Sequence, residues 1–434
     1  MDGSDSFLSI DPDPLSSTQL LPEEGEEEVE EVEEERDVIC EHLSGPSRSE
    51  GPQYLLDLFS VTGKALRELS KFSCNEAIAT LQALPSEHYN TAWVLTQVAR
   101  AYFEMGQYRQ AQKVFQKLRH LDPSCTQGME YYSVTLWQLQ DEVALSGLAQ
   151  ELVAADRLSP QTWCAVGNCF SLQKEHQTAL RFFNRAIQLA PNFAYTYTLC
   201  GHEYIANDDL DKAFHSFRKG IRCSPTHYNA WYGLGLVFFR QKKFDLSYYH
   251  FQRACQLNSA SSTIRLYLGL VLREQGKLQE ARAHMEAAIS IDPKNLLAKF
   301  HHASILRELK DYERSLAELN ELQQVLPTEA PIYMLLGKIH HRLKQYDIAL
   351  GHFHTALDLS PRDSTTIKPM IERLTSKAAA APPPPQTPAP RSTPLASSSF
   401  QTPSSSTPGA DGSQSFVEDT FGSTIDDSSN DLVH

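Results

Sequence analysis

A 34-residue spacing of prolines constrains the fold of this chain more than any other feature. The prolines of this series lie 34 or 68 residues apart: Pro123, Pro191, Pro225, Pro293, Pro327 and Pro361. A proline ends a helix, because it has no backbone N–H and its ring clashes with the preceding turn. The spacing therefore predicts equal units, each closed by a helix that stops at the same place.

Nine frames of 34 residues, without insertions, cover the middle of the chain; they start at 58, 92, 126, 160, 194, 228, 262, 296 and 330. Position 8 of most frames is small: Gly167, Gly201, Gly235, Gly269, Ala303 and Gly337. Position 20 is also small: Ala77, Ala111, Ala179, Ala213, Ser247, Ala281, Ser315 and Ala349. Position 24 is large and apolar, as in Phe115, Phe183, Phe217, Phe251 and Phe353. Small residues let two helices approach closely, and the large residue fills the space beside them.

A period of 34 residues with this pattern is typical of the tetratricopeptide repeat (TPR), a helix–turn–helix unit. The sequence therefore predicts an all-α fold, a right-handed TPR superhelix of about nine repeats over residues 53–363. The frame at 126 departs from the pattern, with Ser133, Leu145 and Arg157 at positions 8, 20 and 32, but the frames on both sides keep phase. Apolar residues in 364–378 predict a helix that caps the end of the stack.

Charge is concentrated at the ends of the chain. The net charge is −15, yet residues 1–60 hold 18 acidic and 2 basic side chains. Ten glutamates fall between Glu23 and Glu35, which predicts a disordered acidic tail over residues 1–52. This tail is either simply solvated or makes an electrostatic contact with a basic partner. The middle of the chain is only mildly basic, which does not favour a nucleic-acid partner.

The C-terminal segment 379–434 is rich in proline, serine and threonine, and we expect it to be disordered. Four Thr-Pro steps are candidate phosphorylation sites: Thr387, Thr393, Thr402 and Thr407. The N-terminus lacks the apolar region of a secretory signal, and no apolar run is long enough for a membrane span. These features predict a soluble intracellular protein that contacts no membrane.

No catalytic motif stands out in the sequence. Gly233 and Gly235 lack the third glycine of a dinucleotide loop, and no P-loop, nucleophile elbow or zinc-protease motif occurs. The eight cysteines form no C-x-x-C pair, and adjacent histidines on a helix point about 100° apart. We therefore expect no enzyme activity, no cofactor and no metal site.

A TPR stack presents the first helix of each repeat to a concave groove, usually with positions 2, 5, 9 and 12. In the frames from 160 to 262 these positions and their neighbours combine amides, hydroxyls and aromatic rings. The candidate groove residues are Asn168, Tyr195, His202, Glu203, Asn229 and Tyr232. Such side chains can bind a peptide backbone or a C-terminal carboxylate while a pocket receives an apolar side chain.

Two segments carry a family resemblance: WCAVGNCFSLQKEHQTALRFFNRAIQLAPNFAYTYTLCGHEY at 163–204 and HYNAWYGLGLVFFRQKKF at 227–244. With the neighbouring repeats, from about Leu55 to Arg362, they resemble the C-terminal TPR block of the cell division cycle protein 27 family. That family supplies scaffold subunits of the anaphase-promoting complex, or cyclosome, a ubiquitin ligase. The resemblance implies a non-catalytic scaffold, present in nucleus and cytoplasm and at the spindle. It also implies other cyclosome subunits as partners and a groove that binds the C-terminal Ile-Arg tails of coactivators.

Two further expectations follow from the resemblance. Family members form a homodimer through an N-terminal TPR block, whereas only an acidic tail precedes the repeats here, so dimerisation through that block is not implied. The alternative function is a general TPR adaptor, such as a co-chaperone. A clamp for chaperone tails needs lysine or arginine beside groove asparagines in consecutive frames. Asn168 fits this pattern, but the next frame offers Tyr195 and His202, which favours the cyclosome scaffold.

Overall fold

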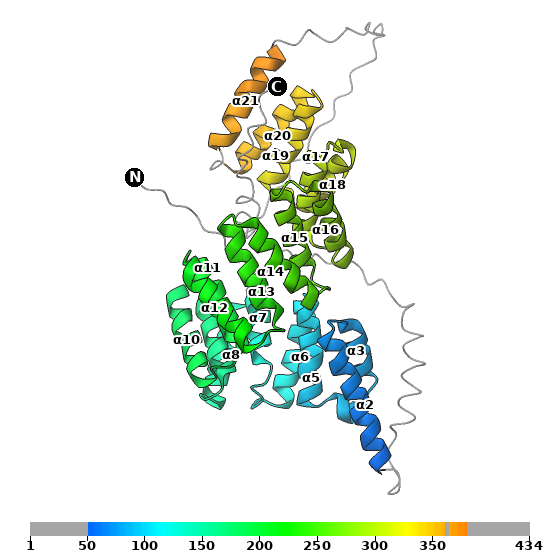
Figure 1. The fold of residues 1–434 in the computed structure, drawn as a ribbon, viewed down its shortest axis with the longest axis vertical. Coiled ribbons are helices and arrows are strands. Elements are labelled where there is room, and N and C mark those ends of the chain that lie inside the picture. Colours follow the sequence, from blue (N-terminus) through cyan, green and yellow to red (C-terminus); the bar gives the residue numbers. More distant parts are fainter. Residues whose placement is uncertain (1–50, 361–363, 380–434) are drawn as a thin grey trace, which may run out of the picture. The chain divides into compact units, whose positions relative to one another are not determined.

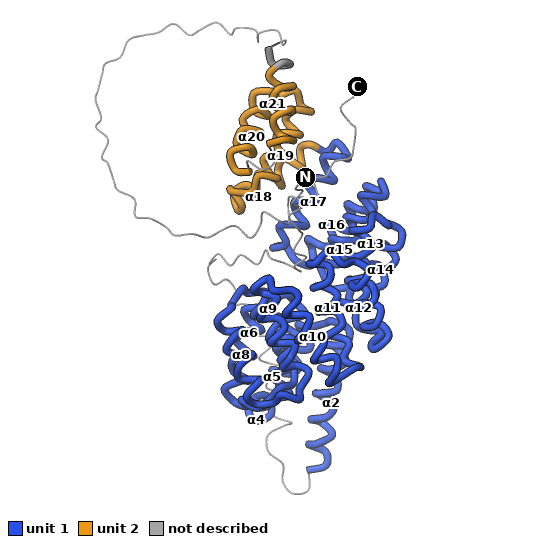
Figure 2. The backbone as a smooth tube through the Cα atoms, turned by 90° about the vertical axis from the view of Figure 1, so that its left-hand side faces the viewer, with its two compact units in different colours: residues 1–311 blue, residues 312–434 orange. Residues whose placement is uncertain are grey.

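The computed structural model describes residues 51–360 and 364–379, and every regular element in these ranges is an α-helix. The chain divides after Asp311 into two compact units (Figures 1 and 2). Unit 1 contains α2 (Gly51–Ser70), α3 (Cys74–Gln82), α4 (Ser86–Tyr89), α5 (Ala92–Glu104), α6 (Tyr108–Leu121), α7 (Met129–Gln138), α8 (Glu142–Ala155), α9 (Pro160–Leu172), α10 (His176–Leu189), α11 (Ala194–Ala206), α12 (Leu210–Cys223), α13 (Tyr228–Arg240), α14 (Phe244–Leu257), α15 (Ser262–Glu274), α16 (Leu278–Ile291) and α17 (Leu296–Glu308). Unit 2 contains α18 (Tyr312–Val325), α19 (Ala330–Arg342), α20 (Tyr346–Leu359) and α21 (Ser364–Ala379).

Consecutive helices pair in the order that the 34-residue frames predict. Within unit 1, α5 packs on α6, α9 on α10, α11 on α12, α13 on α14 and α15 on α16. Within unit 2, α19 packs on α20, and α20 packs on α21. The predicted all-α TPR fold is confirmed. The segments 1–50 and 380–434, including the glutamate run and the four Thr-Pro steps, lie outside the described residues.

The core of each helix pair follows the repeat positions. Every position-20 residue from Ala77 to Ala349 is fully buried. In the frame at 126 this residue is the large Leu145, which is fully buried as well. The phenylalanines at position 24 are among the largest fully buried side chains. Gly235 lies so close to Phe251 that a Cβ atom on it would stand 2.6 Å from the ring. The small residue at position 8 is therefore required by the ring at position 24 of the same repeat.

The turn between the two helices of a repeat uses one residue with positive φ. This residue is at position 15 in all nine frames: Phe72, Gly106, Gln140, Lys174, Asp208, Lys242, Gly276, Lys310 and Lys344. In the frame at 228, the N–H of Lys243 donates to the carbonyl of Phe238, and the N–H of Lys242 donates to that of Phe239. These two bonds form a Schellman motif, which ends the first helix by a left-handed residue. Seven frames accept this conformation without glycine.

The aromatic residue at position 4 fixes the loop that precedes its own repeat. Trp231 Nε1 donates to the carbonyl oxygen of Pro225 at 2.9 Å, and Tyr197 Oη donates to that of Pro191 at 3.0 Å. In the degenerate frame the proline position is Arg157, yet its carbonyl still accepts from Trp163 Nε1 at 2.9 Å. Position 4 therefore bridges successive repeats as well as filling space. None of the described helices combines the length and the apolar character that a membrane span requires.

Candidate functional site

Seven side chains from α5, α7, α11 and the start of α13 form a ring of contacts inside unit 1. We call them the inner cluster: Arg100, Glu104, Glu130, Tyr131, Tyr195, His227 and Tyr228. The Arg100 guanidinium lies over the Tyr131 ring, 5.4 Å from its centre. The Tyr131 ring meets Tyr195 edge-on at 5.4 Å, and Tyr195 meets His227 at 6.0 Å. Glu130 and Tyr195 are buried, whereas the other five are half-buried and keep part of their surface exposed.

The ring closes through a contact between α13 and α5. Tyr228 Oη donates a hydrogen bond to Glu104 Oε2 at 2.7 Å, although the two residues are 124 positions apart. Phe72, the positive-φ residue between α2 and α3, packs edge-on against the Tyr228 ring at 5.3 Å. Tyr228 therefore joins α13 to α5, the first helices of two repeats that are four frames apart in the sequence. The inner sides of these two repeats thus contact each other.

The inner cluster combines two carboxylates with one cation. Burial raises the pKa of Glu130 to about 7, against the weaker opposing effects of backbone N–H groups and Arg100. Glu130 Oε2 accepts no hydrogen bond from any described residue. Burial also raises the pKa of Glu104, which the hydrogen bond from Tyr228 and the charge of Arg100 oppose. Burying a carboxylate oxygen without a hydrogen-bond partner is unfavourable. Glu130 Oε2 would therefore be stabilised by a hydrogen-bond donor from a ligand.

The histidine of the inner cluster adds no charge at neutral pH. Burial, assisted by the nearby positive charge of Arg100, lowers the pKa of His227 to about 4. Its imidazole is therefore neutral at pH 7, and the His227 and Tyr195 rings pack in an edge-type contact. At neutral pH the positive charge of this surface belongs to Arg100, while Glu130, with a pKa of about 7, is only partly ionised.

Three of the residues predicted for the groove are buried in contacts with neighbouring helices. Asn168 Nδ2 donates to Ser133 Oγ at 2.9 Å. Glu203 accepts from Ser171 Oγ at 2.6 Å and pairs with His176 Nδ1 at 2.8 Å. Tyr195 belongs to the inner cluster. The structure thus brings Tyr195 together with charged groups, while Asn168 and Glu203 already have protein partners.

The other three predicted residues lie on α11 and α13. His202 packs edge-on against Phe217 at 5.2 Å, and burial lowers its pKa to about 4. Tyr232 is only 4% exposed and packs its ring on Phe251 and Tyr267 in the apolar core of unit 1. Asn229 is half-buried near the start of α13. Whether any of the six predicted residues contacts a ligand stays a prediction.

Sequence reasoning missed six of the seven residues of the inner cluster. Two of them carry a readable signal, because Arg100 is position 9 of the frame at 92 and Glu130 is position 5 of the frame at 126. Positions 5 and 9 also line the expected groove in the frames from 160 to 262, so the same positions in the two earlier frames point to Arg100 and Glu130. Glu104 and Tyr228 occupy positions 13 and 1, outside that set, so their contact has no sequence signal.

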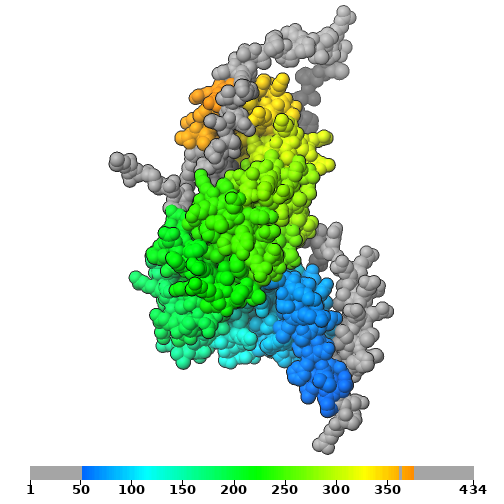
Figure 3. Space-filling model, viewed as in Figure 1, coloured from blue at the N-terminus to red at the C-terminus, as the bar shows by residue number. Residues whose placement is uncertain are grey.

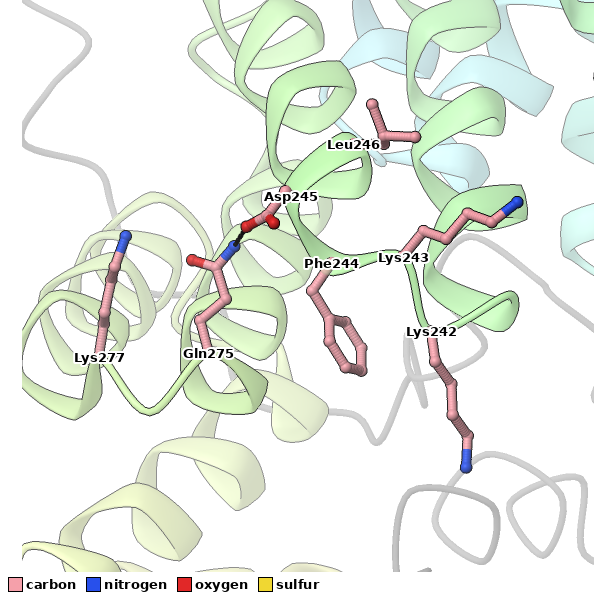
Figure 4. Close-up of a pocket in the computed structure, with 7 residues that line it drawn as sticks. All are labelled: Lys242, Lys243, Phe244, Asp245, Leu246, Gln275 and Lys277. Carbon is pink, nitrogen blue, oxygen red and sulfur yellow. Dashed lines mark hydrogen bonds between the residues drawn. The ribbon is translucent and has the colours of Figure 1, made fainter.

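A separate pocket of about 630 Å³ lies at the turns that lead into α14 and α16 (Figure 4). It is lined by Lys242, Lys243, Phe244, Asp245, Leu246, Gln275 and Lys277. Gln275 Nε2 donates to Asp245 Oδ1 at 3.0 Å, and Figure 4 shows the three lysine side chains pointing in different directions. With no convergent charges, this pocket is a weaker candidate site than the inner cluster. Within the described ranges, no three side chains of His, Cys, Asp or Glu are grouped to hold a metal ion.

Comparison with known proteins places the helical pairs in a family. Models of the tetratricopeptide repeat match residues 98–144, 160–193, 201–262 and 272–339. Over 344 residues, 77% of this chain, the sequence is 44% identical to cell division cycle protein 27 homolog A of Arabidopsis thaliana. This chain is a tetratricopeptide-repeat homologue of cell division cycle protein 27. It is also 46% identical over 159 residues to anaphase-promoting complex subunit 3 of Schizosaccharomyces pombe.

The match covers a part of each relative. It spans 48% of the Arabidopsis protein and 24% of the fission-yeast protein, whose match takes up 37% of this chain. A solved structure, the APC/C hetero-tetramer Cut9–Hcn1, aligns with 69% of this chain and 58% of its own, with a TM-score of 0.62. Its sequence identity is 18%, so it supports the fold of stacked helical pairs and nothing finer.

Proposed function

We propose that this chain is a non-catalytic TPR subunit of the anaphase-promoting complex, and that it supports ubiquitination at the transition from metaphase to anaphase. The observation that carries this proposal is the 44% identity to a cell division cycle protein 27 homolog over 77% of the chain. Its partners would be the other subunits of that complex, in nucleus and cytoplasm and at the spindle.

The finer proposal is that the inner cluster binds the C-terminal Ile-Arg tail of a coactivator. Glu130 Oε2 has no partner among the described residues, and Glu104 lies on the facing helix. A guanidinium group would satisfy a buried carboxylate with charge-assisted hydrogen bonds. Arg100 would receive the terminal carboxylate, and the rings of Tyr131 and Tyr195 offer an apolar surface for the isoleucine. This chemistry supports a basic tail over the acidic tail that a co-chaperone binds.

Affinity purification of the tagged full chain from dividing cells tests the assignment. We expect recovery of other subunits of the anaphase-promoting complex together with coactivators. An Arg100→Ala chain should still recover the subunits but lose most of the coactivator, because Arg100 would receive the terminal carboxylate of the tail. Recovery of chaperones without any subunit of the complex would refute the assignment.

A further inference from the structure

The second helices of three consecutive repeats share an unusual charge pattern. Residues 178–189 of α10, 212–223 of α12 and 246–257 of α14 contain no aspartate or glutamate. Six exposed cations lie on these segments, and we call them the basic face: Arg181, Arg185, Arg218, Lys219, Arg222 and Arg253. A seventh cation, Lys212, is excluded because its ammonium group pairs with Asp209.

The repeat register places these cations on one side of the stack. Arg185, Lys219 and Arg253 all occupy position 26, so they lie at equivalent points of neighbouring repeats. The others are at positions 22, 25 and 29. Together with position 26, these positions span an arc of about 100° around the helix axis. Figures 1 and 2 both show α10, α12 and α14 following one another along unit 1, and Figure 3 shows this part of the chain (green) as a continuous surface.

No described carboxylate neutralises the basic face. Arg185 and Arg253 donate to the amide oxygens of Gln188 and Gln256, at 3.1 and 2.8 Å, and the guanidinium of Arg253 lies over the Trp231 ring. These contacts orient the two guanidinium groups without cancelling their charge. None of the six cations forms an ion pair with a residue in the described ranges. The basic face is therefore available to an anionic ligand.

We propose that the basic face docks the glutamate run of this same chain, Glu23–Glu35. The run supplies ten carboxylates, and 15 residues separate it from Gly51, the first residue of α2. Fully extended, such a connection reaches about 50 Å. A covalently attached run that reaches the surface has an effective concentration in the millimolar range, which would favour it over acidic segments of other proteins. Docking would cover the outer side of α10, α12 and α14 and keep it from acidic partners.

Zero-length carbodiimide coupling of the full-length chain tests this docking, because it joins a lysine amine only to a carboxylate in contact with it. We expect peptides that link Lys219 to the glutamate run, located by mass spectrometry. In 1 M salt the Debye length falls to about 3 Å, so the linked fraction should fall as well. A linked fraction that does not change with salt would overturn the electrostatic docking.

Two triple variants locate the surface. Replacing Arg185, Arg218 and Arg222 with alanine should lower the linked fraction by about fivefold, since each exposed ion pair contributes a modest free energy. The matched control replaces three exposed cations of α6, Arg109, Lys113 and Lys117, and should change the fraction by less than about twofold. Equal losses in both variants would contradict the assignment of the surface.

A mixture of isotopically heavy and light chains tests whether the contact is intramolecular. We expect links within one chain, so heavy and light peptides should not be joined to each other. Mixed heavy–light links as frequent as pure ones would show docking on a second chain and refute the intramolecular proposal. These results are independent of tail binding by the inner cluster, because the basic face shares no residue with it.

Discussion

Glu130 shows how one residue ties the fold to the proposed function. Its carboxyl group is buried within the electrostatic reach of Arg100 on α5, and burial raises its pKa to about 7. The ordinary pKa of 4.5 applies when the chain is unfolded, so the folded state holds the proton more tightly. Consequently the contribution of Glu130 to stability declines as the pH rises from about 4.5 to about 7. A guanidinium group of a bound ligand would offset the free-energy cost of burying the ionised Glu130 carboxylate.

Glu130→Gln should therefore stabilise the free protein at high pH only. We expect the free energy of unfolding to rise by about 1–3 kcal/mol at pH 8 and to stay nearly unchanged at pH 4.5, because glutamine has no charge to bury. Urea unfolding at the two pH values measures the difference. Glu175→Gln, at an exposed carboxylate, is the control and should have no such pH dependence. An equal effect of Glu130→Gln at both pH values would contradict the burial argument.

Lys242 holds a positive φ of 56° at the turn between α13 and α14, where a side chain is unfavourable. Lys242→Gly should raise the free energy of unfolding by about 0.5–1 kcal/mol, because glycine adopts this conformation without steric cost. Its neighbour Lys243 has a φ of −92°, so Lys243→Gly should be neutral or destabilising. Thermal unfolding of both variants tests this, and stabilisation by Lys243→Gly alone would refute it.

At the scale of the helices, the repeat positions explain why the fold could be predicted from sequence. The proline spacing sets the ends of the second helices, and the pair of positions 8 and 24 sets how closely the helices approach. The structure adds two features that the pattern did not predict: the positive φ at position 15 and the bond from position 4 to the carbonyl at position 32. Both depend on backbone conformation, which non-glycine residues such as Lys242 do not reveal.

Gly235→Ala tests the close approach of α13 and α14. The added Cβ would stand 2.6 Å from the Phe251 ring, which cannot move away in a filled core, so we expect a loss of about 1–3 kcal/mol in unfolding free energy. Gly147→Ala on α8 is the control, since a Cβ there meets nothing within 4 Å and should stabilise its helix by up to about 1 kcal/mol. Chemical denaturation compares the two, and similar losses would contradict the packing model.

At the scale of unit 1, the inner cluster depends on how successive repeats turn relative to one another. A sequence frame shows which residues face inward, as Arg100 and Glu130 do, but it does not show which frames meet. The contact between Tyr228 and Glu104 spans 124 positions, so small rotations at each repeat must add up to bring them together. That sum depends on the packing of every intervening helix pair, and for this reason the closure was not predictable.

Tyr228→Phe removes this closure without changing the apolar ring. Glu104 then keeps a carboxylate oxygen without its hydrogen-bond donor, and we expect a loss of about 1–3 kcal/mol in unfolding free energy. Hydrogen exchange should become faster at the end of α5 and the start of α13. Tyr249→Phe, at a ring that is 56% exposed, is the control and should change neither quantity. Unchanged exchange in Tyr228→Phe would show that the contact does not hold these helices together.

Isothermal titration calorimetry with a peptide that ends in Ile-Arg tests the central claim most directly. The full chain should bind the peptide, and amidation of its C-terminus or the variant Glu130→Gln should each weaken binding by about tenfold or more, because each removes a charged hydrogen bond. Glu175→Gln should bind as the unmodified chain does. Unchanged affinity after both amidation and Glu130→Gln would contradict tail binding by the inner cluster.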